Sequence, residues 1–244
     1  MVLGASLGSF FNVWIDRLPK KQSIILPASR CSDCGKSIPF WLNIPILSYL
    51  ILRGKCKYCG AKIHIHHLVV EIVTPLILLA LFFKFGTDLI LFAKYAILFF
   101  FLIPIFFIDI FHRLILDKLT IPMAIIGLAF ALLPESDITF LNAMLTSVGI
   151  LVIMLLIAWL FEKVRKKEGM GGGDIKLLAA MAAYVGAINI SFIVFFSSLL
   201  AVGFALFSRK GREDGIPYGP FLAAAALVWV LTGNFFLGWY LSMF

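Results

Sequence analysis

The sequence predicts an all-α polytopic membrane protein with about eight transmembrane helices and a small zinc-binding cytoplasmic loop domain. Three observations predict this class: 62% of the residues are hydrophobic, only 14% are charged, and the mean hydropathy is +1.04. A soluble domain of 244 residues cannot expose so much apolar surface to water. Apolar runs of about 18 residues or more indicate helices that cross a bilayer. We assign spans to residues 1–15, 68–86, 88–108, 119–134, 139–161, 175–187, 189–207 and 218–242.

The first of these segments begins at residue 1 and is short. It lacks a basic start and an Ala-x-Ala-like cleavage site, so we interpret it as a span and not as a signal peptide. Gly4, Ala5 and Gly8 place small side chains along it at about four-residue spacing. Small residues let two helices approach closely in a membrane, so we expect a tight helix contact there.

The basic residues orient the spans, because they gather in alternate loops. Nineteen of the 21 Lys and Arg residues lie in four segments, namely Arg17–Lys62, Arg113–Lys118, Lys163–Lys176 and Arg209–Arg212. The positive-inside rule places these segments in the cytoplasm and both chain ends outside. Topology and anionic lipid therefore explain the net charge of +8. We expect the lipid bilayer as a partner and no nucleic acid.

Residues 16–67 form the long polar segment and carry all four cysteines. Cys31 and Cys34 form one Cys-x-x-Cys pair, and Cys56 and Cys59 form a second, with 21 residues between the pairs. Each pair is followed by glycine, in a tight turn that can direct two thiolates at one ion. Four thiolates close the tetrahedral shell of zinc, so we predict a structural Zn²⁺ at these cysteines. A pair of redox dithiols is the alternative, but it does not require two matching pairs.

Three histidines and a glutamate follow the second cysteine pair. Because four thiolates already satisfy zinc, we interpret His64, His66 and His67 as solvated or interfacial residues. Glu71 enters the next apolar segment, where a carboxylate is costly enough to mark a functional site. Near the interface, the same carboxylate can instead reach water or pair with a loop arginine.

A glycine-rich run precedes the sixth apolar segment and ends in a carboxylate. It contains Gly169, Gly171, Gly172, Gly173 and Asp174. Glycine allows unusual backbone angles and the close approach of another chain. The carboxylate falls near the positive end of the helix that follows. A plain flexible linker has a similar composition and stays open as an alternative.

A second carboxylate changes the interpretation of that run. Asp109 closes another apolar segment, and the predicted topology puts it on the same membrane face as Asp174. Asp117 follows Asp109 by eight residues, roughly 12 Å along a helix, which is too far for these two to share a proton. Spacing alone therefore leaves both Asp109 and Asp117 open as the partner of Asp174.

Paired carboxylates at a membrane edge support a specific chemistry. Two carboxylates about 3 Å apart cannot both ionise, so one keeps a proton while the other acts as a base. The base activates water and the acid polarises a peptide carbonyl, which gives hydrolysis without a covalent intermediate. A proton-coupled transporter also uses membrane carboxylates, but it more often places them near the midplane.

Together these motifs resemble the type IV prepilin peptidases, a family of prepilin leader peptidase/N-methyltransferases, over nearly the whole chain. The resemblance rests on the order and the spacing of several short motifs along the chain. Its segments are Gly8–Val13, Arg17–Pro19, the two cysteine pairs, Asn43–Ser48, Arg53–Cys56, Glu71, Asp109–Asp117, Met170–Leu177 and Ile216–Phe221. Leu116, Tyr218 and the run His66–Leu68 depart from the family's usual Pro, Phe and Arg-Tyr-Pro-like residues.

The resemblance implies an intramembrane aspartyl protease of the Gly-x-Gly-Asp type. It makes Asp109 and Asp174 the catalytic pair, with Gly171, Gly172 and Gly173 as the active-site loop. The implied substrates are type IV prepilins and type II secretion pseudopilins at the cytoplasmic face of the bacterial inner membrane.

The resemblance also implies methylation of the new N-terminus from S-adenosylmethionine, and Glu71 is a candidate on the methyltransferase side. The implied organisation is a first helix at 1–15, a methyltransferase-associated zinc region at 16–67 and a multi-span peptidase domain at 68–244. One alternative is a peptidase alone, with the zinc loop as a docking platform. A carboxylate-lined transporter is the other.

Overall fold

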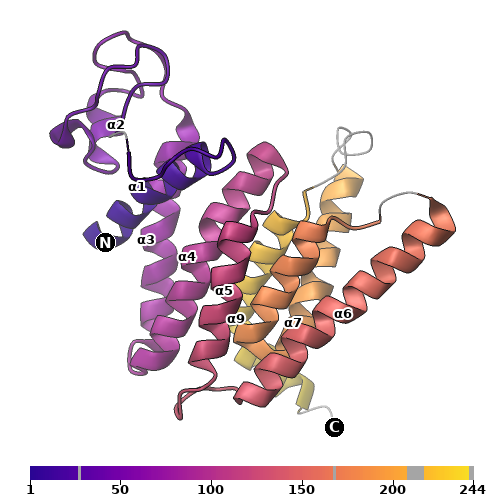
Figure 1. Ribbon diagram of the computed structural model, residues 1–244. Helices are drawn as coiled ribbons and strands as arrows, with labels where there is room; N and C mark the ends of the chain where they lie inside the picture. Colours follow the sequence, from indigo (N-terminus) through magenta and orange to yellow (C-terminus); the bar gives the residue numbers. More distant parts are fainter. Residues whose placement is uncertain (27–28, 167–168, 208–216, 242–244) are drawn as a thin grey trace. The chain divides into compact units, whose positions relative to one another are not determined.

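The computed structural model describes residues 1–26, 29–166, 169–207 and 217–241. Across these ranges the chain is helical, and its only strand-like features are two isolated bridges. The α-helices are α1 Val2–Arg17, α2 Leu47–Ile51, α3 Ile65–Phe85, α4 Leu89–His112, α5 Asp117–Phe130, α6 Phe140–Arg165, α7 Gly172–Phe207 and α9 Gly219–Leu241, with a 3-10 turn η1 at Phe40–Leu42 (Figure 1). The chain divides into two compact units, Met1–Phe83 and Lys84–Phe244. The three-part division predicted from the sequence stays a prediction.

In the first unit, α1 packs tightly against α3. A Cβ atom at Gly4 would lie 2.7 Å from the Cα of Pro75, and one at Gly8 would lie 2.8 Å from the Cα of Glu71. No larger side chain fits at either position without moving α3. The predicted close helix contact is therefore confirmed, and its partner is α3.

In the second unit, α7 lies at the centre of a helical bundle (Figure 1). It packs against α5, α6 and α9, while α4 packs against α5 and α9. The first half of α7 is buried, with Leu177, Met181 and Tyr184 fully enclosed. Alanines fill the positions between these residues, and such small side chains allow neighbouring helices to approach.

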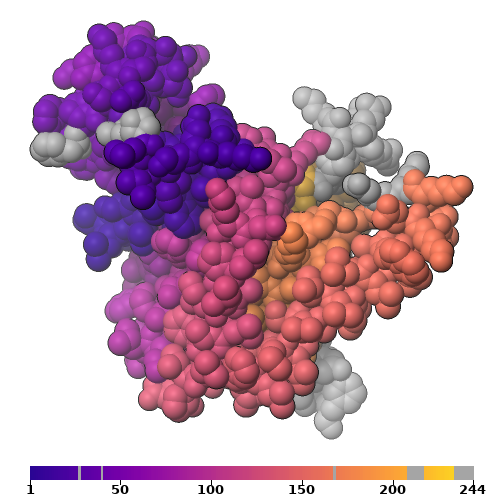
Figure 2. All heavy atoms as spheres, in the orientation of Figure 1, coloured from indigo at the N-terminus to yellow at the C-terminus, as the bar shows by residue number. Residues whose placement is uncertain are grey.

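Hydrogen-bonding residues cap two helices of this bundle. The Asp88 carboxylate accepts a hydrogen bond from the Leu91 N–H at 2.9 Å at the start of α4. The Thr139 hydroxyl accepts one from the Asn142 N–H at 3.3 Å at the start of α6. Each cap satisfies a backbone donor that has no partner inside its helix. Most of α6 lies on the outer face of the bundle, as Figure 2 shows, which suits a surface that faces lipid.

The number of spans differs from the prediction. Within the described residues there are eight α-helices, and four of them are long and apolar enough to cross a bilayer, namely α3, α4, α6 and α7. The first and fourth predicted spans form α1 and α5, which have only 16 and 14 residues, shorter than the ~20 that a bilayer core requires. The prediction of about eight spans is therefore corrected to eight helices.

The sixth and seventh predicted spans are joined in α7. The helix is interrupted at Gly186, whose backbone takes φ 72° and ψ 178°. This conformation favours glycine because it has no Cβ atom. The sequence predicts a boundary at residue 188, and the structure places the break two residues earlier. The basic run predicted at Arg209–Arg212 lies outside the described residues.

Candidate active site and metal centre

The end of α4 holds Asp109 in a buried position. Arg113 ends the helix in the left-handed region at φ 53°, and its N–H donates to the Asp109 carbonyl at 2.9 Å. The Asp109 side chain is only 4% exposed. Its Oδ2 accepts a hydrogen bond from the Gly219 N–H at 3.0 Å, at the start of α9. The carboxylate is thus anchored between the end of one helix and the beginning of another.

The start of α7 brings Asp174 to the same place. The Asp174 N–H donates to the Gly171 carbonyl at 3.0 Å, which closes the first turn of the helix. The Asp174 Oδ1 atom is buried, and no described group donates a hydrogen bond to it. Asp109 lies close enough to Asp174 for the two carboxyl groups to interact electrostatically. The structure therefore brings these two predicted site residues together.

Ile115 and two glycines set the spacing of this site. A Cβ atom at Gly173 would lie 2.9 Å from the Cβ of Ile115. A Cβ atom at Gly219 would lie 2.7 Å from Asp109 Oδ2 and 3.3 Å from Ile115 Cδ1. The starts of α7 and α9 can thus converge on the segment after α4 only because both positions lack a side chain. By contrast, nothing lies within 4 Å of a Cβ atom built at Gly172.

Asp117 is engaged elsewhere. Both of its carboxylate oxygens lie 2.8 Å from the Lys176 Nζ, and the two side chains are about half exposed. This ion pair joins the start of α5 to the first turn of α7. The structure therefore pairs Asp117 with a lysine, while Asp109 is the carboxylate that interacts electrostatically with Asp174.

Sequence reasoning missed Ile115, the role of Lys176 as a partner, and a hydroxyl cluster beside Gly219. The Tyr218 hydroxyl lies 2.6 Å from Ser197 Oγ and 3.1 Å from Ser198 Oγ, within hydrogen-bond distance of both. The opposite charges of Asp117 and Lys176 are a sequence signal for their pairing. The position of Ile115 has no such signal, since it depends on packing alone.

The four cysteines of the first unit form one cluster. Their sulfur atoms all lie within 4.8 Å of one another, and the Sγ atoms of Cys31 and Cys59 are 3.8 Å apart. Both pairs use the same turn, because the N–H groups of Gly35 and Gly60 each donate at 3.0 Å to the carbonyl of the first cysteine of their pair. Both glycines have positive φ, 66° and 72°.

This cluster fits a tetrahedral metal ion. Zinc–sulfur bonds of about 2.3 Å place the sulfurs of a tetrahedral site roughly 3.8 Å apart, which matches the separation of Cys31 and Cys59. The backbone N–H groups of Cys59 and Tyr58 hold the pKa of the Cys56 thiol down at about 7. A thiolate is the form that binds metal, so the turn geometry suits a cation among the four sulfurs.

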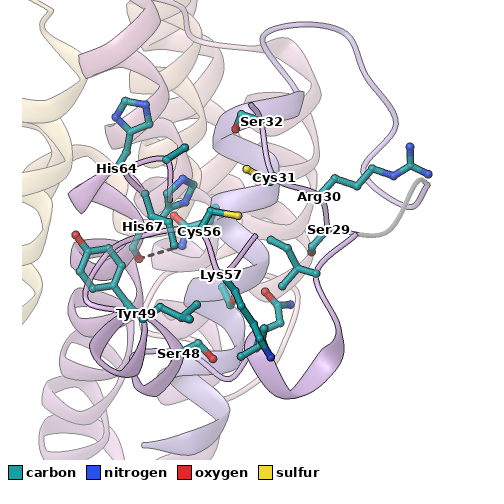
Figure 3. A pocket seen from close by; sticks show the side chains of 18 of the residues that line it. Ser29, Arg30, Cys31, Ser32, Ser48, Tyr49, Cys56, Lys57, His64 and His67 are labelled. Carbon is teal, nitrogen blue, oxygen red and sulfur yellow. Dashed lines mark hydrogen bonds between the residues drawn. The ribbon is translucent and has the colours of Figure 1, made fainter. Parts of the chain in front are cut away.

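A cavity of about 330 Å³ lies beside this cluster in the first unit (Figure 3). Its walls include Cys31 and Cys56, residues of the connecting loop, and Glu71 from α3. Glu71 is 9% exposed, and its Oε2 accepts a hydrogen bond from the Ile46 N–H at 2.7 Å. Ile46 has positive φ, 65°, so this bond holds a strained loop residue in place. The predicted site residue Glu71 thus lies in the pocket wall.

Comparison with protein families gives two matches. Residues 2–85 match the family described as the Bacterial Peptidase A24 N-terminal domain, and residues 96–206 match the Type IV leader peptidase family. The two matches fall on the cysteine-bearing unit and on the helical bundle, respectively. No solved structure matches this chain.

Similar curated proteins share one name, prepilin leader peptidase/N-methyltransferase. The protein of Dichelobacter nodosus is 36% identical over 88% of this chain and 75% of its own length. That of Xanthomonas campestris pv. campestris is 34% identical over 98% of this chain and 92% of its own. That of Pseudomonas aeruginosa is 33% identical over 96% and 89%. These relatives are aligned over both units and over most of their own lengths.

Proposed function

Because this chain belongs to the type IV leader peptidase family, we propose that it removes the leader of type IV prepilins and pseudopilins and then N-methylates the new N-terminus. It is an integral protein of the bacterial inner membrane. The basic loops favour a cytoplasmic position for the cysteine loop and for the peptidase site. Since the relatives' shared name carries both activities, the peptidase-only and transporter alternatives are not favoured.

In this proposal Asp109 and Asp174 are the catalytic pair. The Gly219 N–H stabilises negative charge on Asp109, so Asp109 is the base that takes a proton from the attacking water. Asp174, with a buried oxygen that has no described donor, carries the shared proton and donates it to the scissile carbonyl oxygen. Water adds to that carbonyl carbon, and the carbon–nitrogen bond then breaks as the nitrogen receives a proton.

The glycine run supports this step from the substrate side. A prepilin presents its cleavage site where a basic leader meets an apolar helix, and that bond must unwind because a helical carbonyl is already hydrogen-bonded. Gly171 and Gly172 are exposed, and the space beside Gly172 is open. An extended substrate segment can therefore lie along this backbone and form hydrogen bonds with it. Gly173 and Asp174 are the next two residues in the sequence.

The cysteine cluster and its pocket carry the second activity. Cys31, Cys34, Cys56 and Cys59 would hold a structural Zn²⁺ that keeps the loop folded. The methyl donor, S-adenosylmethionine, supplies a methyl group from a sulfonium cation. The pocket volume of about 330 Å³ lies in the range of small-molecule sites, and Glu71 contributes a carboxylate to its wall.

The aromatic wall of the pocket also suits this donor. Tyr49 and Tyr58 line it, and their rings attract a cation such as sulfonium. Methyl transfer needs a neutral amine, and in the precursor the same nitrogen is an amide. Cleavage therefore precedes methylation.

The observation that carries the peptidase assignment is the buried Asp109 beside Asp174 with its unpartnered oxygen. The test is to co-express a pilin-like precursor with the wild-type chain and with Asp174→Asn, and to determine the substrate's N-terminus by mass spectrometry. The wild type should yield a shortened, methylated product and Asp174→Asn an intact precursor. Full processing by a membrane-inserted Asp174→Asn variant would remove this pair from the mechanism.

A further inference from the structure

A second group of metal-binding side chains lies in the first unit, apart from the cysteines. Asp16 ends α1, while His66 and His67 open α3. The Nε2 atom of His66 lies 3.7 Å from Asp16 Oδ1, and the Nε2 atom of His67 lies 3.7 Å from Asp16 Oδ2. One ligand atom from each of the three residues lies within 4.8 Å of the other two.

The separations between Asp16 and the two imidazoles suit ligands of a shared ion. A nitrogen and an oxygen 3.7 Å apart are too distant for a hydrogen bond. Imidazole and carboxylate ligands lie about 2.0–2.2 Å from a zinc-type ion, so two ligands of one ion are separated by roughly 3–3.7 Å. Both nitrogen–oxygen separations thus lie at the upper end of the range that such an ion requires.

Two ion pairs to one carboxylate would hold this cluster only at an electrostatic cost. The rings of His66 and His67 are only 4.2 Å apart between centroids. Two imidazolium rings at this distance would repel each other, so Asp16 cannot hold both as charged partners without a cost. Neutral imidazoles have no such repulsion, and the neutral ring is the form that binds metals.

The triad is built on a rigid base. Asn12 Nδ2 donates a hydrogen bond to the His67 carbonyl at 3.0 Å, which joins α1 to the first turn of α3. One turn earlier in α1, Gly8 packs directly against Glu71. The two helices that supply the three ligands are therefore fixed against each other, as a metal site requires.

We propose that Asp16, His66 and His67 bind a second divalent transition-metal ion of the zinc class. The four cysteines complete a tetrahedral shell by themselves, so this ion is distinct from theirs. Three protein ligands leave at least one coordination position free. Asp16 and His67 both line the pocket, and Figure 3 labels His67 in its wall, so the free position faces a small-molecule cavity. It accepts a lone-pair donor such as an amine or a carboxylate.

The test measures zinc bound to the full chain in detergent, after chelation and reloading. The wild type should retain about two ions per chain, whereas His66→Gln combined with His67→Gln should retain about one. His64→Gln is the matched control, because His64 stacks on His66 with 5.5 Å between ring centroids but does not belong to the triad. It should bind as many ions as the wild type.

Cobalt identifies which site is lost. In a variant that combines Cys31→Ser, Cys34→Ser, Cys56→Ser and Cys59→Ser, Co²⁺ at the triad should give weak visible bands without the intense thiolate absorption of the cysteine site. Asp16→Asn in that background should abolish these bands. Zinc should also raise the Tm of the wild type more than that of the double histidine variant, although the two metal-free proteins unfold alike. Equal zinc content in the wild type and the double histidine variant overturns the proposal, as does the same loss in His64→Gln.

Discussion

Replacing Gly219 by alanine tests whether the position of Asp109 controls cleavage. The new Cβ atom would lie 2.7 Å from Asp109 Oδ2, whereas ordinary contacts begin at 3.4 Å, so one group must move by about 0.7 Å. Asp109 cannot turn away freely, because its Oδ2 accepts the Gly219 N–H at 3.0 Å. The same Cβ position also lies 3.3 Å from Ile115 Cδ1, so the added methyl group has a second close neighbour.

A displacement of this size should be costly. Misplacing a reacting group by 1 Å can reduce a rate by about 100-fold, so we expect Gly219→Ala to lower kcat/KM for leader cleavage on the order of 10- to 100-fold. This loss corresponds to about 1.4–2.7 kcal/mol of transition-state stabilisation. The assay follows a synthetic precursor by mass spectrometry with the purified full chain in detergent.

Matched glycine variants serve as controls. Nothing lies within 4 Å of a Cβ atom built at Gly149 or Gly203, so alanine there should leave cleavage within about threefold of wild type. Methylation of an already mature peptide by Gly219→Ala should persist, which shows that the first unit is intact. If Gly219→Ala cleaved as fast as Gly203→Ala, the carboxylate of Asp109 would not require the position that the structure gives it.

Three further predictions concern the carboxylates and the cysteines. Asp109→Asn and Asp174→Asn should each nearly abolish cleavage, and the double variant should be scarcely slower than either single variant. The two carboxyl groups act as one catalytic unit, so removing either one already removes the catalysis that the pair provides. Additive losses in single-turnover rates would contradict this prediction. Asp117→Asn should reduce cleavage only a few-fold, since it breaks a half-exposed ion pair worth about 1 kcal/mol or less; a loss as large as that of Asp109→Asn would place Asp117 in the site. Cys31→Ser with Cys34→Ser should suppress methylation and leave cleavage largely intact. Loss of zinc should unfold the loop, whereas the backbone hydrogen bonds of the membrane helices are satisfied within each helix. Full methylation of a mature peptide by this variant would show that the loop is not required for that activity.

Several features could be predicted from the sequence because each depends on local chemistry. Hydropathy and length locate the membrane helices, because the free energy of moving an apolar segment from water into lipid depends on that segment's own residues. The spacing of Cys31, Cys34, Cys56 and Cys59 predicted one cluster, and their sulfur atoms do gather within 4.8 Å. The role of zinc there stays a proposal, as do the catalytic roles of the aspartates.

Other features depended on packing between distant segments. Spacing left Asp109 and Asp117 as equal candidates, and the structure separates them because Lys176 pairs with Asp117 while Gly219 donates to Asp109. Hydropathy likewise predicted a boundary in α7 but not the backbone angles at Gly186.

The grouping of Asp16, His66 and His67 also could not be predicted from the sequence. Read along the chain, the histidines lie next to a complete set of thiolates, so the sequence favoured a solvated or interfacial position. The contact of α1 with α3, set by Gly4 and Gly8 against Pro75 and Glu71, brings a carboxylate from fifty residues earlier to these two rings. The sequence by itself determined which long apolar segments are helical and which residues can bind metal or protons. Only the tertiary structure decided which of those residues lie close together. Helix packing brings together residues that are far apart in the sequence, and their sequence separation does not predict their distance in space.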